Sequence, residues 1–300
     1  MAGSSVGAAT LLGSVAILLW GSLALLATLA GPVPPFLLTA ITFGLAGIVG
    51  TGFILLRGAT GRKAVAAWAT QSPRAWAIGV GGLFGYHLLF FVALRAAPAV
   101  QANLINYLWP LCIVVFSAFL PGERLRWFHC VGGVLGLAGT VLLVGGPALA
   151  VQIEYLPGYL AALGAALCWG GYSVLSRRYC AAVPTDFVAA LCLVTALLAG
   201  LCHLVLEAVY IPSAHDWLIM AIMGAGPLGA AFFFWDVGVK RGLLRALGAA
   251  SYATPLLSTL GLYLGGRAQI TLDVLFAAVL IVGGAVLAGS DALRGKKSPA

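Results

Sequence analysis

The stretch APAVQANLINYLWPLCIVVFSAFL, residues 97–120, places two asparagines, a tyrosine, a tryptophan and a proline inside an otherwise apolar run. The run is long enough to cross a bilayer, because a spanning helix needs about 20 predominantly apolar residues. A helix that only packs in a core or faces lipid has no need of these polar groups. The role of these polar residues therefore depends on the rest of the chain and on the solvent around it.

The composition of the chain identifies its solvent. It has 300 residues, of which 62% are hydrophobic and only 8% charged, whereas an ordinary soluble domain carries about 25% charged residues. So few charges leave lipid as the solvent for most of the surface. Barrel strands would alternate over about ten residues, and the apolar runs do not alternate. We therefore predict an all-α integral membrane protein with ten transmembrane helices, near residues 9–29, 34–56, 76–95, 97–119, 127–146, 157–178, 184–207, 217–239, 243–265 and 270–290.

The distribution of basic residues predicts the orientation and excludes a nucleic-acid partner, although the net charge is +8. If the N-terminus is cytoplasmic and the chain crosses the membrane ten times, only Arg95 and Arg267 lie on the side of the membrane away from the cytoplasm. Fourteen basic residues fall inside, as the positive-inside rule requires: Arg57, Arg62, Lys63, Arg74, Arg124, Arg126, Arg177, Arg178, Lys240, Arg241, Arg245, Arg294, Lys296 and Lys297. Both termini are therefore predicted to be cytoplasmic. A cleaved signal peptide is a minor alternative for the first segment, whose apolar stretch exceeds the usual length of about 7–15 residues.

The two halves of the chain resemble each other. Residues 1–150 are predicted to form a first five-helix repeat, and residues 151–300 a second one with a short basic C-terminal tail. Three pairs of segments share an offset of 145 positions: 85–95 with 230–240, 102–111 with 247–256, and 132–143 with 277–288. Because five helices is an odd number, the second copy enters from the opposite side. Inverted repeats are a characteristic build of secondary transporters, with the substrate site between the repeats near the midplane.

Polar and aromatic stripes indicate the candidate site. Asn103, Asn106, Tyr107 and Pro110 lie within about 100° of arc on one helix face. Pro110 also leaves the carbonyl of Asn106 without its usual donor, which is tolerated at membrane depth only against protein or a wet cavity. Hydrogen bonding between helices is the alternative. Because aromatic walls suit a flat hydrophobic ligand, we predict these substrate-binding residues: Tyr86, His87, Asn103, Asn106, Tyr107, Trp109, Trp169, Tyr172, Ser173 and Tyr252.

Two sets of titratable residues need separate interpretation. His87 lies well inside its segment, where a titratable group is a functional hypothesis by default. It can bind a substrate carboxylate or sense protons, and a buried neutral histidine with one partner is the alternative. Asp236 and Lys240, four residues apart, favour a structural ion pair.

Other chemistries lack their motifs. The six cysteines have neither metal nor disulfide spacing, so no metal and no cofactor are expected. The sequence contains no GxxxxGK[ST], GxSxG or HExxH motif, which disfavours direct use of ATP and an intramembrane enzyme.

Several motifs resemble a known family. Trp-Gly at 20–21 and 169–170, the segment LPGERL (120–125) and a Gly-rich fifth helix resemble the drug/metabolite transporter superfamily in its ten-helix, EamA-type form. NYLWPL (106–111) is similar to the branch that exports aromatic amino acids and methyl viologen. Two residues depart from the family pattern: Ala268 stands in place of an acid that would match Glu123, and Thr42 stands in place of a frequent Arg. These departures weaken the assignment of residue roles from the broad superfamily, but they do not contradict the resemblance to the aromatic branch.

The resemblance implies a function. It implies export of Phe, Tyr, Trp and related small compounds across a bacterial inner membrane by alternating access, by a protein that works as a monomer, with a dimer left open. A broad-specificity exporter of drugs or organic cations is the first alternative. A helical membrane scaffold or an intramembrane enzyme is the second.

Overall fold

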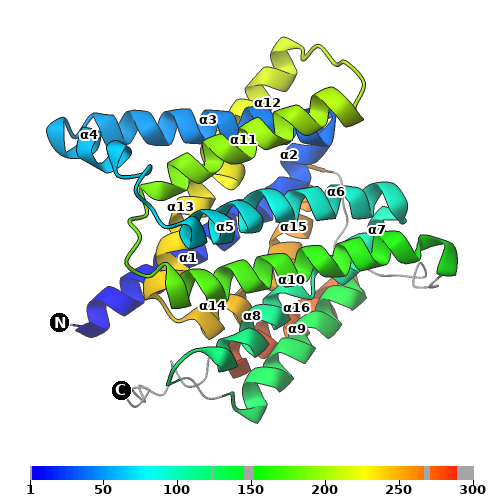
Figure 1. Ribbon diagram of the computed structural model, residues 1–300. Helices are drawn as coiled ribbons and strands as arrows, with labels where there is room; N and C mark the ends of the chain where they lie inside the picture. The colour runs from blue at the N-terminus through cyan, green and yellow to red at the C-terminus, as the bar shows by residue number, and fades with distance from the viewer. Residues whose placement is uncertain (1, 123–124, 145–151, 267–270, 289–300) are drawn as a thin grey trace.

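The computed structural model describes residues 2–122, 125–144, 152–266 and 271–288 (Figure 1). All regular secondary structure in these residues is helical. Glu123, Ala268, most of the predicted boundary between the halves and the basic C-terminal tail lie outside the described residues.

In its described residues, the first half contains nine α-helices. They are α1 (Ala2–Gly21), α2 (Leu23–Ala30), α3 (Pro35–Leu55), α4 (Ala59–Ala66), α5 (Pro73–Val80), α6 (Tyr86–Ala96), α7 (Ala99–Asn106), α8 (Trp109–Phe116) and α9 (Trp127–Val144). A π-helical turn, Gly81–Gly85, joins α5 to α6, and a short 3-10 helix, Ser117–Phe119, follows α8.

The described part of the second half contains seven α-helices. They are α10 (Leu156–Tyr179), α11 (Phe187–Leu206), α12 (Ala214–Ala225), α13 (Ala231–Arg241), α14 (Leu244–Ala250), α15 (Ala253–Leu264) and α16 (Leu272–Ala288). A 3-10 turn, Ile153–Tyr155, precedes α10, and a second π-helical turn, Gly226–Ala230, joins α12 to α13.

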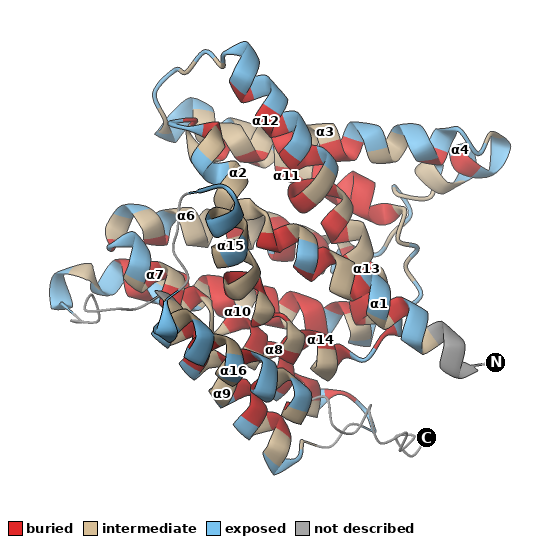
Figure 2. Cartoon of the chain, turned by 180° about the vertical axis from the view of Figure 1, so that it is seen from behind, coloured by how far each residue is buried: buried red, intermediate tan, exposed pale blue. Residues whose placement is uncertain are grey.

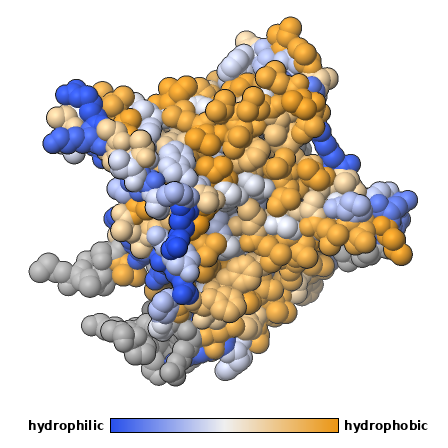
Figure 3. Space-filling model, viewed as in Figure 1, coloured by the Kyte–Doolittle hydropathy of each residue, from blue (hydrophilic) through white to orange (hydrophobic). Residues whose placement is uncertain are grey.

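Seven continuous segments of the described chain are long and apolar enough to cross a membrane. They are Val6–Ala30, Pro35–Leu55, Pro73–Ala96, Ala99–Phe119, Ile153–Tyr179, Phe187–Leu206 and Ala214–Arg241. Two shorter apolar helices, Trp127–Leu143 and Leu272–Ala288, accompany them. Figure 3 shows hydrophilic residues along the edge that carries α4 and again at the opposite edge, with a hydrophobic surface between them. The chain is therefore a multi-pass α-helical membrane protein.

The helices pack in pairs that come from different halves. α3 packs along α11, and α9 packs along α16, while α1 packs along α13 and α10 along α6. In Figure 1 the α3–α11 pair lies at the top, the α9–α16 pair at the bottom, and the other pairs between them. Glycines permit the closest approach, because a Cβ atom on Gly132 of α9 would lie 2.5 Å from the carbonyl oxygen of Gly284 of α16. Small residues allow such close packing in membranes, where the hydrophobic effect does not drive helices together.

Local sequence explains where several helices begin. The Ser72 hydroxyl accepts a hydrogen bond from the Ala75 amide at the start of α5, and Ser213 with Asp216 forms a capping box at the start of α12. Both arrangements satisfy amide groups that have no partner inside the helix. Pro35 occupies the first position of α3, where its missing N–H removes no intrahelical bond.

Interruptions divide several of the helical segments. The chain leaves helical geometry between α7 and α8 because Pro110 cannot donate to the carbonyl of Asn106. It does so again between α14 and α15, where Pro255 stands four residues after Ser251. The two π-helical turns lie 145 positions apart in the chain. Such turns often mark functional sites, and here they border the centre of the molecule.

The most buried residues lie where helices of the two halves meet. Ile113 of α8, Trp235 of α13 and Leu247 of α14 are fully buried. Figure 2 shows the buried segments concentrated where α1, α8, α10, α13 and α14 come together, whereas much of α9, α12 and α16 is exposed. The exposed faces are apolar, as expected for helices in contact with lipid.

Candidate functional site: a central aromatic cavity

A cavity of about 440 Å³ lies between helices of both halves. Its volume falls within the range of about 300–1,000 Å³ that is usual for small-molecule sites. Ala27, Leu94 and Ala99 belong to its lining and stand close to the ends of α2, α6 and the start of α7, so the cavity extends toward the edge opposite α4 (Figure 1). The other lining residues are Trp20, Leu23, Ala24, Tyr86, His87, Phe90, Asn103, Asn106, Tyr107, Trp109, Trp169, Leu228, Phe232, Thr254 and Ser258.

A cluster of rings closes the cavity on the side of α4. The ring of Trp20 lies 6.1 Å from Trp109, 5.7 Å from Trp169 and 5.0 Å from Trp235, mostly edge-to-face. Such pairs contribute about 0.5–1.5 kcal/mol beyond the area that they bury. The Trp20 indole N–H donates to the carbonyl of Pro227 at 3.0 Å, which fixes its orientation. Aromatic rings therefore form both the closed end and part of the wall.

The break in the fourth segment turns its polar face into the cavity. Asn106 Nδ2 donates to the Tyr86 hydroxyl at 3.1 Å, and the Asn106 Oδ1 atom is buried without a hydrogen-bond partner among the described residues. Trp109 would point about 120° away from Asn103 on an ideal helix, yet it lines the same cavity because α8 starts anew at this residue. An unpartnered buried acceptor costs about 1–3 kcal/mol, so this polar atom in the wall of the cavity is not explained by packing alone.

His87 is nearly buried and surrounded by rings. Its Nδ1 atom lies 2.7 Å from the Leu83 carbonyl, and a carbonyl only accepts, so Nδ1 carries the proton. The rings of Phe43, Tyr86 and Phe232 lie 5.0, 5.1 and 6.3 Å from the imidazole. In the neutral ring, Nε2 remains as an acceptor at the cavity wall.

Seven of the ten predicted site residues line this cavity, and three do not. Tyr172 packs on Gly82, where a Cβ atom would lie 2.3 Å from the ring. The Ser173 hydroxyl donates to the Trp169 carbonyl at 3.0 Å and accepts from the Trp235 indole at 3.2 Å. Both residues lie one turn beyond Trp169, on the far side of the tryptophan cluster.

Tyr252 is the third residue that does not line the cavity. It is fully buried against Gly136, where a Cβ atom would lie 2.4 Å from its ring. The prediction for Tyr252 followed its match with Tyr107, but the turn between α14 and α15 points it toward α9 instead.

Sequence reasoning missed several residues of the lining. Trp20 matches Trp169 in the two Trp-Gly pairs at 20–21 and 169–170, so the sequence contains the signal for it. Phe232 and Leu228 belong to an apolar run without a polar stripe, and nothing in their spacing separates them from lipid-facing residues. Phe90 stands one turn from Tyr86, and their rings stack at 5.9 Å.

The predicted Asp236–Lys240 ion pair is present and lies outside the cavity. The Lys240 Nζ atom is 2.7 Å from Asp236 Oδ1, and both side chains are buried. The Thr185 hydroxyl donates to Asp236 Oδ2 at 2.7 Å, and Lys240 donates to the Val183 carbonyl at 3.0 Å. These contacts complete the packing between the tryptophan cluster and the edge that carries α4.

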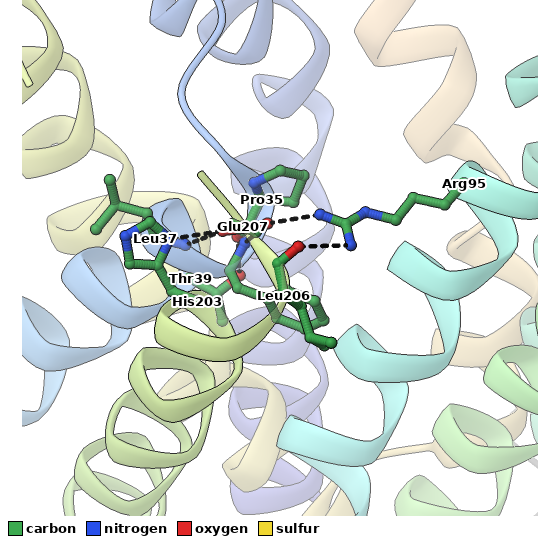
Figure 4. Close-up of polar contacts among 8 residues, drawn as sticks. Pro35, Leu37, Thr39, Arg95, His203, Leu206 and Glu207 are labelled. Carbon is green, nitrogen blue, oxygen red and sulfur yellow. Dashed lines mark hydrogen bonds and ion pairs between the residues drawn. The ribbon is translucent and has the colours of Figure 1, made fainter. Parts of the chain in front are cut away.

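A second charged cluster lies at the opposite edge and was not identified from the sequence. The Glu207 carboxylate accepts from the backbone amides of Phe36 and Leu37, at 2.9 and 3.1 Å, at the start of α3 (Figure 4). His203 Nδ1 lies 2.9 Å and Arg95 3.4 Å from the same carboxylate. A carboxylate at a helix N-terminus is stabilised by the helix dipole. The cluster therefore ties α3, α6 and α11 together near the end of the cavity.

The fold and the site together define a class of protein. Helices of a membrane protein surround an aromatic cavity that extends to one edge and is closed by rings toward the other, and the described residues contain no group of three or more His, Cys, Asp or Glu that could hold a metal. This is the architecture of a transporter. Residues 7–145 and 156–290 each match the EamA-like transporter family, and the chain belongs to that family.

Individual relatives cover almost the whole chain. The chain is 50% identical to the aromatic amino acid exporter YddG of Ancylobacter novellus, over 95% of this chain and 98% of that protein. It is 24% identical to the aromatic amino acid exporter YddG of Escherichia coli strain K12, over 96% and 98%. A solved structure titled "Crystal structure of protein" is 49% identical and superposes with a TM-score of 0.90, over 97% of this chain and 99% of that one.

Proposed function

We propose that this protein is a secondary transporter that exports aromatic amino acids and related small compounds across a bacterial inner membrane. The observation that carries the proposal is the central cavity, whose size suits one amino acid and whose walls hold rings and hydrogen-bonding groups side by side. The printed names of the relatives at 50% and 24% identity support this substrate class.

The cavity offers separate places for the two parts of such a substrate. A flat side chain packs against the rings at the closed end by edge-to-face and offset contacts, which here are those of Trp20, Trp109, Trp169 and Phe232. The amino and carboxylate groups meet polar atoms of the wall, which here belong to Asn103, Asn106, Tyr107, Tyr86 and His87. Alternating access then requires the tryptophan cluster to open as the opposite end closes.

Ten membrane crossings in two inverted repeats, residues 1–150 and 151–300, belong to the same proposal. The 145-position offset of the sequence motifs recurs in the two π-helical turns, and the packing of α1 on α13 has a counterpart in the packing of α10 on α6. α9, the α14–α15 segment and α16 supply the remaining three crossings. The start of α1 and the end of α16 lie on the edge of α4 (Figure 1), which we assign to the cytoplasm. The working unit is one chain.

Export of organic cations is the second candidate. Aromatic rings also bind flat cations through their faces, so methyl viologen belongs in the assay. Among the described residues that line the cavity there is no Asp or Glu, and Asp236 is already paired with Lys240. This favours a zwitterionic aromatic substrate over a dication.

The test is flux through the purified protein in liposomes. Labelled Phe, Tyr, Trp, Lys and methyl viologen are compared, each with and without a pH gradient, and the gradient separates proton antiport from uniport. We expect saturable flux of the three aromatic amino acids and little flux of Lys. Flux of methyl viologen alone would assign the protein to the organic-cation class, and equal flux of Lys and Trp would refute the proposed selectivity.

A further inference from the structure

A second groove of about 510 Å³ lies apart from the central cavity, between α3 and the α12–α13 segment. No residue that lines it also lines the central cavity. The lining residues are Ala46, Val49, Gly50, Phe53, Ile54, Arg57, Asp186, Gly224, Ala225, Ala230, Phe233 and Phe234.

The wall of the groove is apolar and open to the bilayer. Val49 is 47% exposed and Phe53 is 69% exposed, and both lie on the lipid-facing side of α3. Phe233 crosses the floor, since a Cβ atom on Gly50 would lie 2.8 Å from its ring. An occupant of this groove enters from the membrane and is itself apolar over most of its length, as an acyl chain is.

One end of the groove is basic. Arg57 lines it and pairs with Asp186. Next to Arg57, α4 folds back on α3. The two helices approach so closely that only glycine fits at position 61, since a Cβ atom there would lie 1.8 Å from the Ile54 carbonyl oxygen. Arg62 and Lys63 follow Gly61 and are exposed. Figure 2 shows α4 at the end of α3, and Figure 3 shows the hydrophilic residues at that edge.

The charges at this end do not cancel. Neither Arg62 nor Lys63 has an acidic partner in the part of the chain that the structure describes, so α4 adds two uncompensated cations to the paired Arg57. A basic cluster beside an apolar groove at a membrane interface matches an anionic lipid headgroup, and each Lys or Arg near such a surface contributes about 1 kcal/mol.

We propose that this groove binds one anionic phospholipid, with an acyl chain along Phe53 and Phe233 and the phosphate at Arg57, Arg62 and Lys63. The lipid then packs on Phe233 of α13, and the preceding residue, Phe232, lines the central cavity. Lipid binding and the shape of the substrate site are thereby joined through one short segment of α13.

The test is native mass spectrometry of the full chain, purified in detergent, delipidated and titrated with phosphatidylglycerol or phosphatidylcholine. We expect phosphatidylglycerol to be retained in preference. Arg62→Gln and Lys63→Gln each weaken its retention about fivefold, the equivalent of about 1 kcal/mol, and Asp186→Asn strengthens it because Arg57 is released. Arg241→Gln is the matched control, since it removes an exposed charge at the end of α13 away from the groove.

A groove-filling pair tests the apolar part. Val49→Trp fills the groove and abolishes the preference, whereas Ile48→Trp, at the adjacent and 63% exposed position that does not line it, leaves retention unchanged. Equal retention of the two lipids by the unaltered protein overturns the proposal. So does unchanged retention in both charge variants, and so does loss of a dimer in Val49→Trp, which would assign the groove to a second copy of the chain.

Discussion

Trp20 contacts four rings at the closed end of the central cavity, with centroid distances of about 5–6 Å. It touches the tryptophans of α8, α10 and α13 at once, so the closed end of the cavity depends on side chains from both halves. Small rotations of these rings change both the size of the cavity and the seal toward α4. Under the proposed function, binding and gating therefore use the same residues.

Tyr107→Ala and Trp109→Ala test the wall of the cavity. Each removes a ring that contributes about 1.5–3 kcal/mol by burial and about 0.5–1.5 kcal/mol by aromatic pairing. We expect apparent affinity for tryptophan to fall about tenfold or more, since 1.4 kcal/mol is one decade. Val115→Ala, on the lipid-facing side of α8, serves as the control. The assay is uptake of labelled tryptophan into liposomes per amount of folded protein, and equal losses at all three positions would indicate a folding defect instead.

His87→Ala tests the imidazole. The replacement removes the Nε2 acceptor and the hydrogen bond to Leu83, but it leaves the helix and its apolar surroundings in place. We expect lower export at normal levels of inserted protein and a weaker dependence of flux on pH. Flux and pH profile equal to those of the unaltered protein would reduce His87 to a packing role.

At the scale of helices, the α9–α16 pair shows how glycine controls contact. Gly132 and Gly284 face each other so closely that a Cβ atom on either would lie 2.5 Å from the carbonyl oxygen of the other. Gly283, the adjacent residue in α16, has open space around it. Two neighbouring glycines in one helix therefore have opposite roles.

Gly132→Ala and Gly283→Ala exploit this difference. Overpacking at Gly132 is expected to cost about 1–3 kcal/mol, whereas alanine at Gly283 is expected to stabilise the helix by about 0.5–1 kcal/mol. Thermal unfolding of the detergent-solubilised protein measures both, with midpoints that move in opposite directions. A lower midpoint for both variants would show that α16 packs differently from this structure.

The helices also show what the sequence can predict. Apolar length and loop charge are physical signals of a spanning segment, and most of the described helices overlap the predicted segments, whereas α4 lies between two of them. The polar stripe of the fourth segment predicted its cavity face, because the stripe is a property of one helix. The point along a helix at which the cavity ends depends on the neighbouring helices and cannot be predicted from one helix. Tyr172 and Ser173 therefore lie on the predicted helix but beyond the tryptophan cluster. Phe232 and Glu207 acquire their roles only from neighbours on other helices.

At the scale of the whole molecule, the two halves form one site that neither could build alone. Rings from α1, α8, α10 and α13 meet at its closed end, and polar residues of α6 and α7 line its wall. The Glu207 cluster ties α3, α6 and α11 at one edge, and the Asp236–Lys240 pair lies toward the other. Reversal of access must loosen contacts at one edge while it forms contacts at the other.

The proposed orientation predicts a labelling pattern. A single cysteine at Arg62 is expected to react only with reagent on the cytoplasmic side, and one at Ile153, which is 87% exposed, only with reagent on the outside. Both are placed in a chain whose six native cysteines are replaced. Labelling of both positions from one side would rule out the ten-crossing arrangement.

The most direct test of the central claim, that aromatic amino acids occupy the cavity, is substrate protection of a cysteine placed in its wall. Ser258→Cys is a near-isosteric change at a half-buried residue of the lining, in the chain without native cysteines. The measurement is the rate at which a small thiol reagent modifies this cysteine in an actively transporting variant. Tryptophan should slow the reaction in proportion to its occupancy, and lysine should not. An unchanged rate at concentrations of tryptophan that saturate transport would place the substrate elsewhere and contradict the account.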